Sequence, residues 1–127
     1  MRRIILLAAA VLALAACTSQ PIYNVERQAI VTGSGRAPTM AEVESAIVRG
    51  GSVLGWAMTP VRPGVVSGRL ALRTHVAIVD VNYDTKQFSI SYKDSTNLDY
   101  ANGTIHRNYN GWITNLDREI RANLSRL

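Results

Sequence analysis

The stretch "VVSGRLALRTHVAIVDVNYDTKQFSISYK", residues 65–93, decides the fold, because its apolar residues recur at every second position. In its first part Val66, Leu70 and Leu72 fall on one side, while Arg69 and Arg73 fall on the other. Such alternation is the pattern of a β-strand with one buried face. Residues 65–73 are therefore predicted to form a strand.

Two further strands follow in the same stretch, over residues 74–83 and 87–93. In the second of these, Phe88, Ile90 and Tyr92 alternate with polar residues. The strand over 74–83 differs, because Val76 and Ile78 make its opposite face apolar as well. A second apolar surface requires a cover, which the N-terminal segment, a helix, a second copy of the chain or a partner could supply.

Short connections link these strands. The segment 54–61 is predicted as a preceding strand, and "RPG" at 62–64 and "DTK" at 84–86 are turn sequences. Connections this short favour an antiparallel meander of four strands.

A helix is predicted on each side of the meander. "TMAE", residues 39–42, fits a capping box, and Gly50-Gly51 is a stop signal for the helix that it begins. After the strands, apolar residues at helical spacing form one stripe over 105–127: Ile105, Tyr109, Trp112, Ile113, Leu116, Ile120 and Leu124.

Gly111 lies inside that second helix, where glycine costs about 1 kcal/mol relative to alanine. Its missing side chain is expected to let the helix approach the sheet closely. The sequence thus predicts an α+β fold, a single small domain over 39–127 with the order α-β-β-β-β-α, whose antiparallel meander sheet packs with two helices.

The N-terminal residues have a different character. Arg2 and Arg3 precede an uncharged block of 13 residues, Ile4 to Ala16. A membrane-spanning helix needs about 20 apolar residues, so this block is short for one. A positive start, a short apolar run and small residues at its end are typical of a secretory signal peptide. Residues 1–16 are predicted to be cleaved.

The block ends in Leu14-Ala15-Ala16-Cys17, which resembles the lipobox of bacterial lipoproteins. The resemblance implies cleavage between Ala16 and Cys17, diacylation of the Cys17 sulfur and acylation of the new amino group. Thr18 follows, with no Asp just after the cysteine, which in that family favours the outer membrane facing the periplasm over the inner membrane. In size and layout the whole chain also resembles small uncharacterised proteobacterial envelope lipoproteins.

Cys17 is the single cysteine of the chain, so no intramolecular disulfide can form. One fatty chain gives marginal, reversible membrane binding, whereas several chains on one residue anchor a protein stably. The alternatives for this residue are a free buried thiol and an intermolecular disulfide.

Residues 18–38 contain Pro, Gly and Ser around one short apolar piece, and are predicted, with Cys17, to form a flexible tether. The alternative is that Ile22 to Val25 docks on the domain as an edge strand.

Composition narrows the range of partners. The precursor has 14 basic and 9 acidic residues, a net charge of +5, and loss of Arg2 and Arg3 leaves 12 against 9, or +3. This excess is too small and too dispersed to predict nucleic-acid binding. His75 and His106 have no ligand spacing for a metal, and Gly33-Ser34-Gly35 lacks the third glycine of a dinucleotide site. No metal and no cofactor are predicted.

Polar residues gather after the last predicted strand, where Ser95, His106 and Asp94 or Asp99 supply the residue types of nucleophilic catalysis. No Gly-x-Ser-x-Gly elbow is present, and Asp, Ser and Asn also make turns. No catalytic residue is therefore assigned. The candidate binding surface consists of Val76, Ile78, Tyr92, Asp94, Ser95, Asn97, His106, Tyr109 and Asn110.

These observations predict a non-enzymatic, membrane-anchored periplasmic lipoprotein, which works as a binding or accessory module of the cell envelope. Its expected partners are membrane lipid, through acylated Cys17, and an envelope protein or other envelope component, with a homo-oligomer as a further possibility. The alternatives are an envelope hydrolase that uses a Ser95/His106 site and a subunit of a larger envelope complex.

Overall fold

The computed structural model describes residues 18–127, so the predicted signal peptide and Cys17 lie outside the described residues. The elements follow in the order β1 (Ser19–Pro21), β2 (Val25–Ala29), α2 (Met40–Val53), β3 (Ala57–Arg62), β4 (Val65–Leu72), β5 (His75–Tyr83), β6 (Gln87–Thr96), β7 (Thr104–His106) and α3 (Arg107–Ser125).

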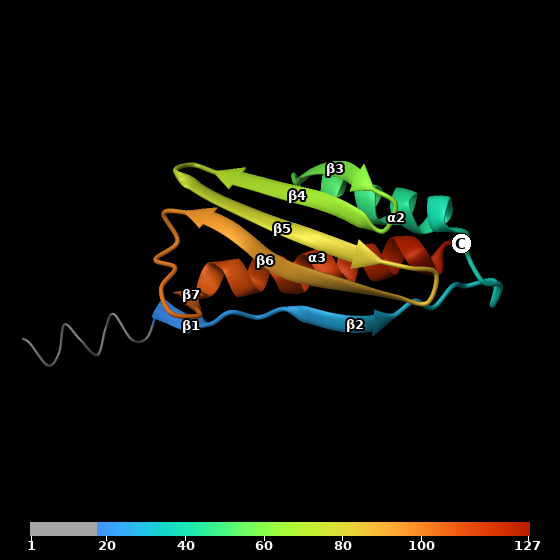
Figure 1. Cartoon of the computed structure of the whole chain (residues 1–127), viewed down its shortest axis with the longest axis horizontal. Helices are drawn as coiled ribbons and strands as arrows, with labels where there is room; N and C mark the ends of the chain where they lie inside the picture. The colour runs from blue at the N-terminus through green and yellow to red at the C-terminus, as the bar shows by residue number, and fades with distance from the viewer. Residues whose placement is uncertain (1–17) are drawn as a thin grey trace, which may run out of the picture.

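Five of the strands form one antiparallel sheet with the order β2-β6-β5-β4-β3, and β1 pairs with β7 in a separate two-stranded sheet. The two helices α2 and α3 pack together behind the five-stranded sheet in the view of Figure 1. The predicted α+β class and the antiparallel meander from β3 to β6 are confirmed.

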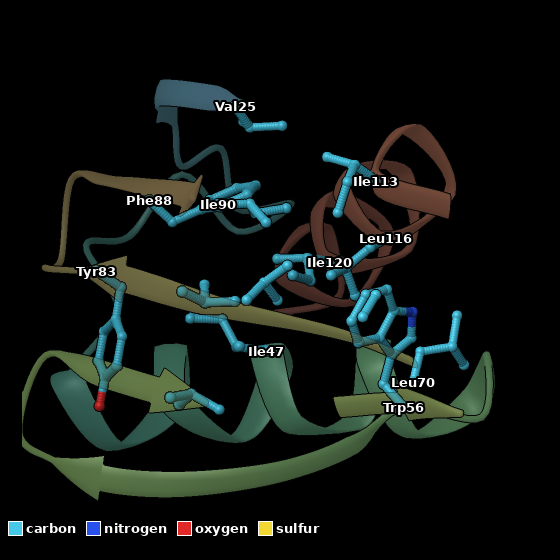
Figure 2. Close-up of a cluster of buried hydrophobic side chains, with 14 of the residues drawn as sticks. Val25, Ile47, Trp56, Leu70, Tyr83, Phe88, Ile90, Ile113, Leu116 and Ile120 are labelled. Atoms are coloured by element: carbon cyan, nitrogen blue, oxygen red, sulfur yellow. The ribbon is translucent and has the colours of Figure 1, made fainter. Parts of the chain in front are cut away.

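The alternation of residues 65–93 sets which side of the sheet is buried. Val66 pairs with Val81, and Leu70 pairs with Ala77, all of them buried beneath the helices. All four belong to one buried cluster with side chains of α2, α3 and β6. Figure 2 shows Leu70 of this cluster together with Ile47, Ile120 and Phe88. Burial of apolar area on this one side provides the main driving force of folding.

The start of α2 follows the predicted capping box. The Thr39 hydroxyl accepts from the Glu42 backbone N–H at 3.1 Å, and the Glu42 carboxylate accepts from the Thr39 N–H at 3.1 Å. Glu42 also pairs with Arg36 at 3.0 Å. The Arg36 guanidinium, followed by the Thr39 N–H, lowers the pKa of Glu42 below its usual value.

Two glycine predictions need correction. Gly50 and Gly51 do not end α2, which continues to Val53; both glycines are buried. A Cβ atom on Gly50 would lie 3.0 Å from the Ile120 backbone, whereas one on Gly111 would meet nothing within 4 Å. Close approach in the helix layer is thus provided by Gly50 between α2 and α3, and not by Gly111.

The predicted tether over 18–38 is wrong for the described residues, because β1 and β2 belong to the two sheets. The edge-strand alternative is closer, since β2 begins at Val25, whose side chain is buried opposite Ile90. A bulge at Arg27, with φ of 50°, lets its backbone N–H bond the Ser89 hydroxyl at 3.0 Å. Burial of Val25 and these bonds outweigh the local preference for a flexible coil.

The far end of the meander also differs from the prediction. β6 continues to Thr96, into the segment expected to be a polar loop, and Ile105 and His106 belong to β7 before α3 begins at Arg107.

Candidate functional site

Val76 and Ile78 lie on the open face of the sheet, opposite the face that the described helices cover. Both side chains are half-buried. Ile78 is flanked by Arg69 of β4 and Asp94 of β6, its partners across the strands. The predicted second apolar surface is therefore a narrow apolar strip on β5 within a polar face.

Three tyrosines form a cluster beside β6. The Tyr92 ring stacks on Tyr100 at a centroid distance of 4.6 Å and meets Tyr109 edge-on at 5.7 Å. Tyr100 is 50% exposed and Tyr109 is fully buried, so the cluster runs from the surface into the core. Burial, with a smaller contribution from Tyr92, raises the pKa of the Tyr109 hydroxyl well above its usual value.

A bulge in β6 places Ser95 in this cluster. Tyr92 pairs with Val79 and Asp94 with Ile78, which leaves Lys93 as the extra residue. Residues three apart in a regular strand point to opposite faces, but the bulge returns Ser95 to the side of Tyr92. The two hydroxyls lie 2.8 Å apart in a hydrogen bond.

His106 caps helix α3. Its ring Nδ1 accepts from the Asn108 backbone N–H at 3.2 Å, while the His106 backbone N–H donates to the Leu98 carbonyl at 2.8 Å. Nucleophilic catalysis requires a hydroxyl bonded to its general base. Within residues 18–127, Ser95 and His106 are bonded to different partners and share no hydrogen bond.

Asn110 fastens the N-terminal segment to α3. Its Oδ1 accepts from the Tyr23 backbone N–H at 3.0 Å, and its Nδ2 donates to the Pro21 carbonyl at 2.9 Å. Asn24 makes a similar bond, in which its Oδ1 accepts from the Tyr92 N–H at 3.0 Å. The assignment of Asn110 to a binding surface stays a prediction; in the structure its amide is hydrogen-bonded to the chain itself.

Asp94 and Asn97 shape the loop after β6. The Asp94 carboxylate accepts from the Ser95 N–H at 2.8 Å. The Asn97 side-chain amide donates to the Thr74 hydroxyl at 2.8 Å, and the Asn97 backbone carbonyl lies 2.7 Å from Nδ1 of His75. These bonds join the loop 97–103 to the β4–β5 turn. We call this part of the molecule the β1 end: β1, β7, the turn at 73–74, the loop 97–103 and the first turn of α3.

The β1 end contains most of the unusual backbone conformations among the described residues. Of the five non-glycine residues with positive φ, four lie here: Arg73, Asn97, Asp99 and Asn102. Such conformations are costly for most side chains and persist where the surroundings fix them.

A groove between β2 and α3 was missed by the sequence analysis. It has a volume of about 430 Å³ and is lined by Gln28, Ala29, Val31, Arg118, Arg121, Ala122, Leu124 and Ser125. Arg121 pairs with Asp117 at 3.2 Å, whereas Arg118 has no ion pair within the described chain. The groove exists because β2 docks. Val25 and Gln28, the inward residues of β2, are three positions apart across the bulge, so the segment shows no period of two that would predict a strand.

Across residues 18–127, no group of three or more His, Cys, Asp or Glu side chains is placed to hold a metal ion. In the same range no helix has the length and apolar character needed to cross a membrane. No protein-family model, curated protein or solved structure matches the chain.

Proposed function

We propose that the chain is a non-enzymatic lipoprotein of the bacterial cell envelope, in which acylated Cys17 holds the domain at the periplasmic face of the outer membrane. The proposal starts from Leu14-Ala15-Ala16-Cys17, which follows a basic pair and an uncharged apolar block. Several fatty chains on one residue anchor a protein stably.

One observation carries the proposal further. β1 begins at Ser19, two residues after Cys17, and Ser19 pairs with His106 of β7. Asn110 adds hydrogen bonds to this segment at Pro21 and Tyr23. An anchor at Cys17 would thus join the bilayer to a fixed strand, which suits a domain that works at the membrane surface.

The hydrogen-bond partners of Ser95 and His106 favour a binding or accessory role over a hydrolase. Ser95 and His106 serve the tyrosine cluster and the helix cap respectively. The half-buried strip at Val76 and Ile78 and the groove beside Arg118 are available for contact with an envelope protein or other envelope component.

Intact-mass measurement of the natural product, with radioactive palmitate labelling, tests the anchor. The wild-type chain is expected to begin at Cys17 and to carry fatty chains in the membrane fraction. Cys17→Ala is expected to lose both the label and the cleavage, while the control Ser45→Ala, on the exposed face of α2, keeps them. A wild-type chain that starts at Met1, or one trimmed but unacylated, would refute the proposal.

Site-specific cross-linking in intact cells tests the binding role. A photo-reactive residue at Ile78 is expected to give a discrete adduct, and the same residue at Ser45 is expected to give none. Equal labelling from both positions would argue against a partner on the open face. A captured protein with fixed stoichiometry after gentle detergent extraction would identify a subunit of a larger complex.

A further inference from the structure

We infer that the β1 end of the domain rests on the lipid headgroups, with the loop 97–103 and the β4–β5 turn against the bilayer and Arg73 and Arg107 on lipid phosphates. This inference rests on the proposed acylation of Cys17. It commits to an anionic bilayer surface as the partner of this end.

The connection between Cys17 and the sheet is short. One peptide unit, about 3.8 Å between Cα atoms, joins residue 17 to Thr18. Ser19 is already paired with His106, so Thr18 alone separates a Cys17 anchor from the sheet. A free coil over 18–38 would have allowed on the order of 25 Å of separation. With β1 fixed, the end of the domain that carries it must stay at the membrane surface.

The loop 97–103 and the β4–β5 turn lie at the same end of the domain as β1. The Ile22 N–H donates to the Gly103 carbonyl at 2.9 Å, which joins β1 to the loop 97–103. Asn97 joins the same loop to Thr74 in the β4–β5 turn. Figure 1 shows these segments together at one end of the molecule, and the C-terminus and the β5–β6 turn at the other.

The exposed side chains of the β1 end have the chemistry that suits a membrane surface. Tyr100 is 50% exposed and Leu72 is 44% exposed, and Arg73 and Arg107 at the same end of the domain are exposed as well. Tyrosine rings favour the level of the headgroups, because one end of the ring is apolar and the other is polar. Arginine forks bind phosphate oxygens in pairs.

Two features make this surface ready for contact. Tyr100 is held by its stack on Tyr92 at 4.6 Å, so ordering it on the membrane costs little further entropy. The charge of the β1 end is also favourable, since Arg73 in the turn and Arg107 at the start of α3 outweigh the carboxylate of Asp99. Anionic headgroups attract such arginines when they lie near the surface.

The test uses the natural acylated protein in vesicles of phosphatidylethanolamine and phosphatidylglycerol. Because acylation occupies the Cys17 sulfur, an introduced cysteine is the single free thiol. Nitroxide labels are placed at Ala101→Cys, in the loop of the β1 end, and at Lys86→Cys, in the β5–β6 turn; both positions are exposed. Collisions with oxygen and with a water-soluble nickel chelate are then compared.

The label at residue 101 is expected to collide severalfold less with the nickel chelate than the label at 86, and more with oxygen. Equal accessibility at the two positions, or greater protection at 86, would overturn the inference. An unacylated product that does not float with the vesicles would instead refute the proposed function, so the two failures are distinguishable.

A charge variant sharpens the test. Two states are compared: the β1 end in contact with the headgroups, and the β1 end away from them. Arg73→Gln and Arg107→Gln are each expected to shift the equilibrium toward the second state by about fivefold on anionic vesicles, which raises the collision rate of the label at 101 with the nickel chelate. The shift should be smaller on phosphatidylcholine vesicles, whose phosphates are balanced by choline and give no net negative surface charge. Arg62→Gln, an exposed residue at the end of β3, is the matched control and should leave the label at 101 unchanged. If Arg62→Gln changes the accessibility of the label at 101 as much as the other two substitutions do, or if neither Arg73→Gln nor Arg107→Gln changes it, the proposed contact of the two arginines with lipid phosphates would be overturned.

Discussion

The two faces of the five-stranded sheet are made by the same alternation, yet they differ in every other respect. One face meets α2 and α3 and buries side chains such as Val79 and Ile90 completely or almost so. The other carries a polar row, in which Ser67, Asp80 and Ser91 lie side by side across three strands. We therefore expect the covered face to provide most of the stability and the open face to tolerate substitution better.

The sharpest way to break this comparison is a matched pair of isoleucines on neighbouring strands. Ile90→Ala, at a side chain that is 1% exposed on the covered face, is expected to lower the free energy of unfolding by about 2–5 kcal/mol. Ile78→Ala, on the open face, should cost about 1 kcal/mol or less. Urea unfolding followed by circular dichroism measures both. Equal losses would show that the open face is covered after all.

A second pair compares the inside and the outside of the helix layer. Gly50→Ala would place a Cβ atom 3.0 Å from backbone atoms of Ile120, and is expected to destabilise the domain by about 1–3 kcal/mol. Gly111→Ala meets open space and should stabilise it by about 0.5–1 kcal/mol. Thermal unfolding of the two variants shows directly whether each substitution raises or lowers the stability relative to the wild type. A loss of stability at residue 111 would contradict the assignment of that side as open.

The smallest effects concern two buried tyrosines. The Tyr83 hydroxyl donates to Glu44 at 2.9 Å, so Tyr83→Phe should cost about 0.5–1.5 kcal/mol. The Tyr109 hydroxyl has no partner among the described residues, so Tyr109→Phe should be neutral or stabilising by up to about 1 kcal/mol. Chemical denaturation at neutral pH resolves the difference. A marked loss from Tyr109→Phe would point to a bonded group that holds this hydroxyl.

The middle of the fold could be read from the sequence because its signals are local. Alternation over residues 65–93 and the capping box at Thr39 each depend on near neighbours in the chain. β1 and β7 could not be read in this way, because each has three residues and its partner is distant in sequence. In β2 only Val25 is buried, so this strand has no repeating apolar pattern from which it could be predicted.

The candidate site was predicted in part. Tyr92, Ser95 and Tyr109 do lie together, but the bulge at Lys93 that brings Ser95 to Tyr92 leaves no mark in the sequence pattern. Asn110 is a residue type that often binds ligands, but here its side chain donates a hydrogen bond to Pro21 of β1. A polar side chain in a loop gives no local indication of whether its partner is solvent, ligand or a distant stretch of its own chain.

The hydrogen bond between Tyr23 and Asn110 joins positions 87 residues apart, and this separation affects the order in which parts of the domain fold. The beginning of the chain can be fastened only after nearly all of it has been synthesised, and closing so long a loop is a late step of folding. If the chain is exported from its N-terminus, as we propose, Tyr23 would still lack its Asn110 partner while most of the chain is crossing the membrane. Maturation of the proposed anchor would then precede completion of the sheet.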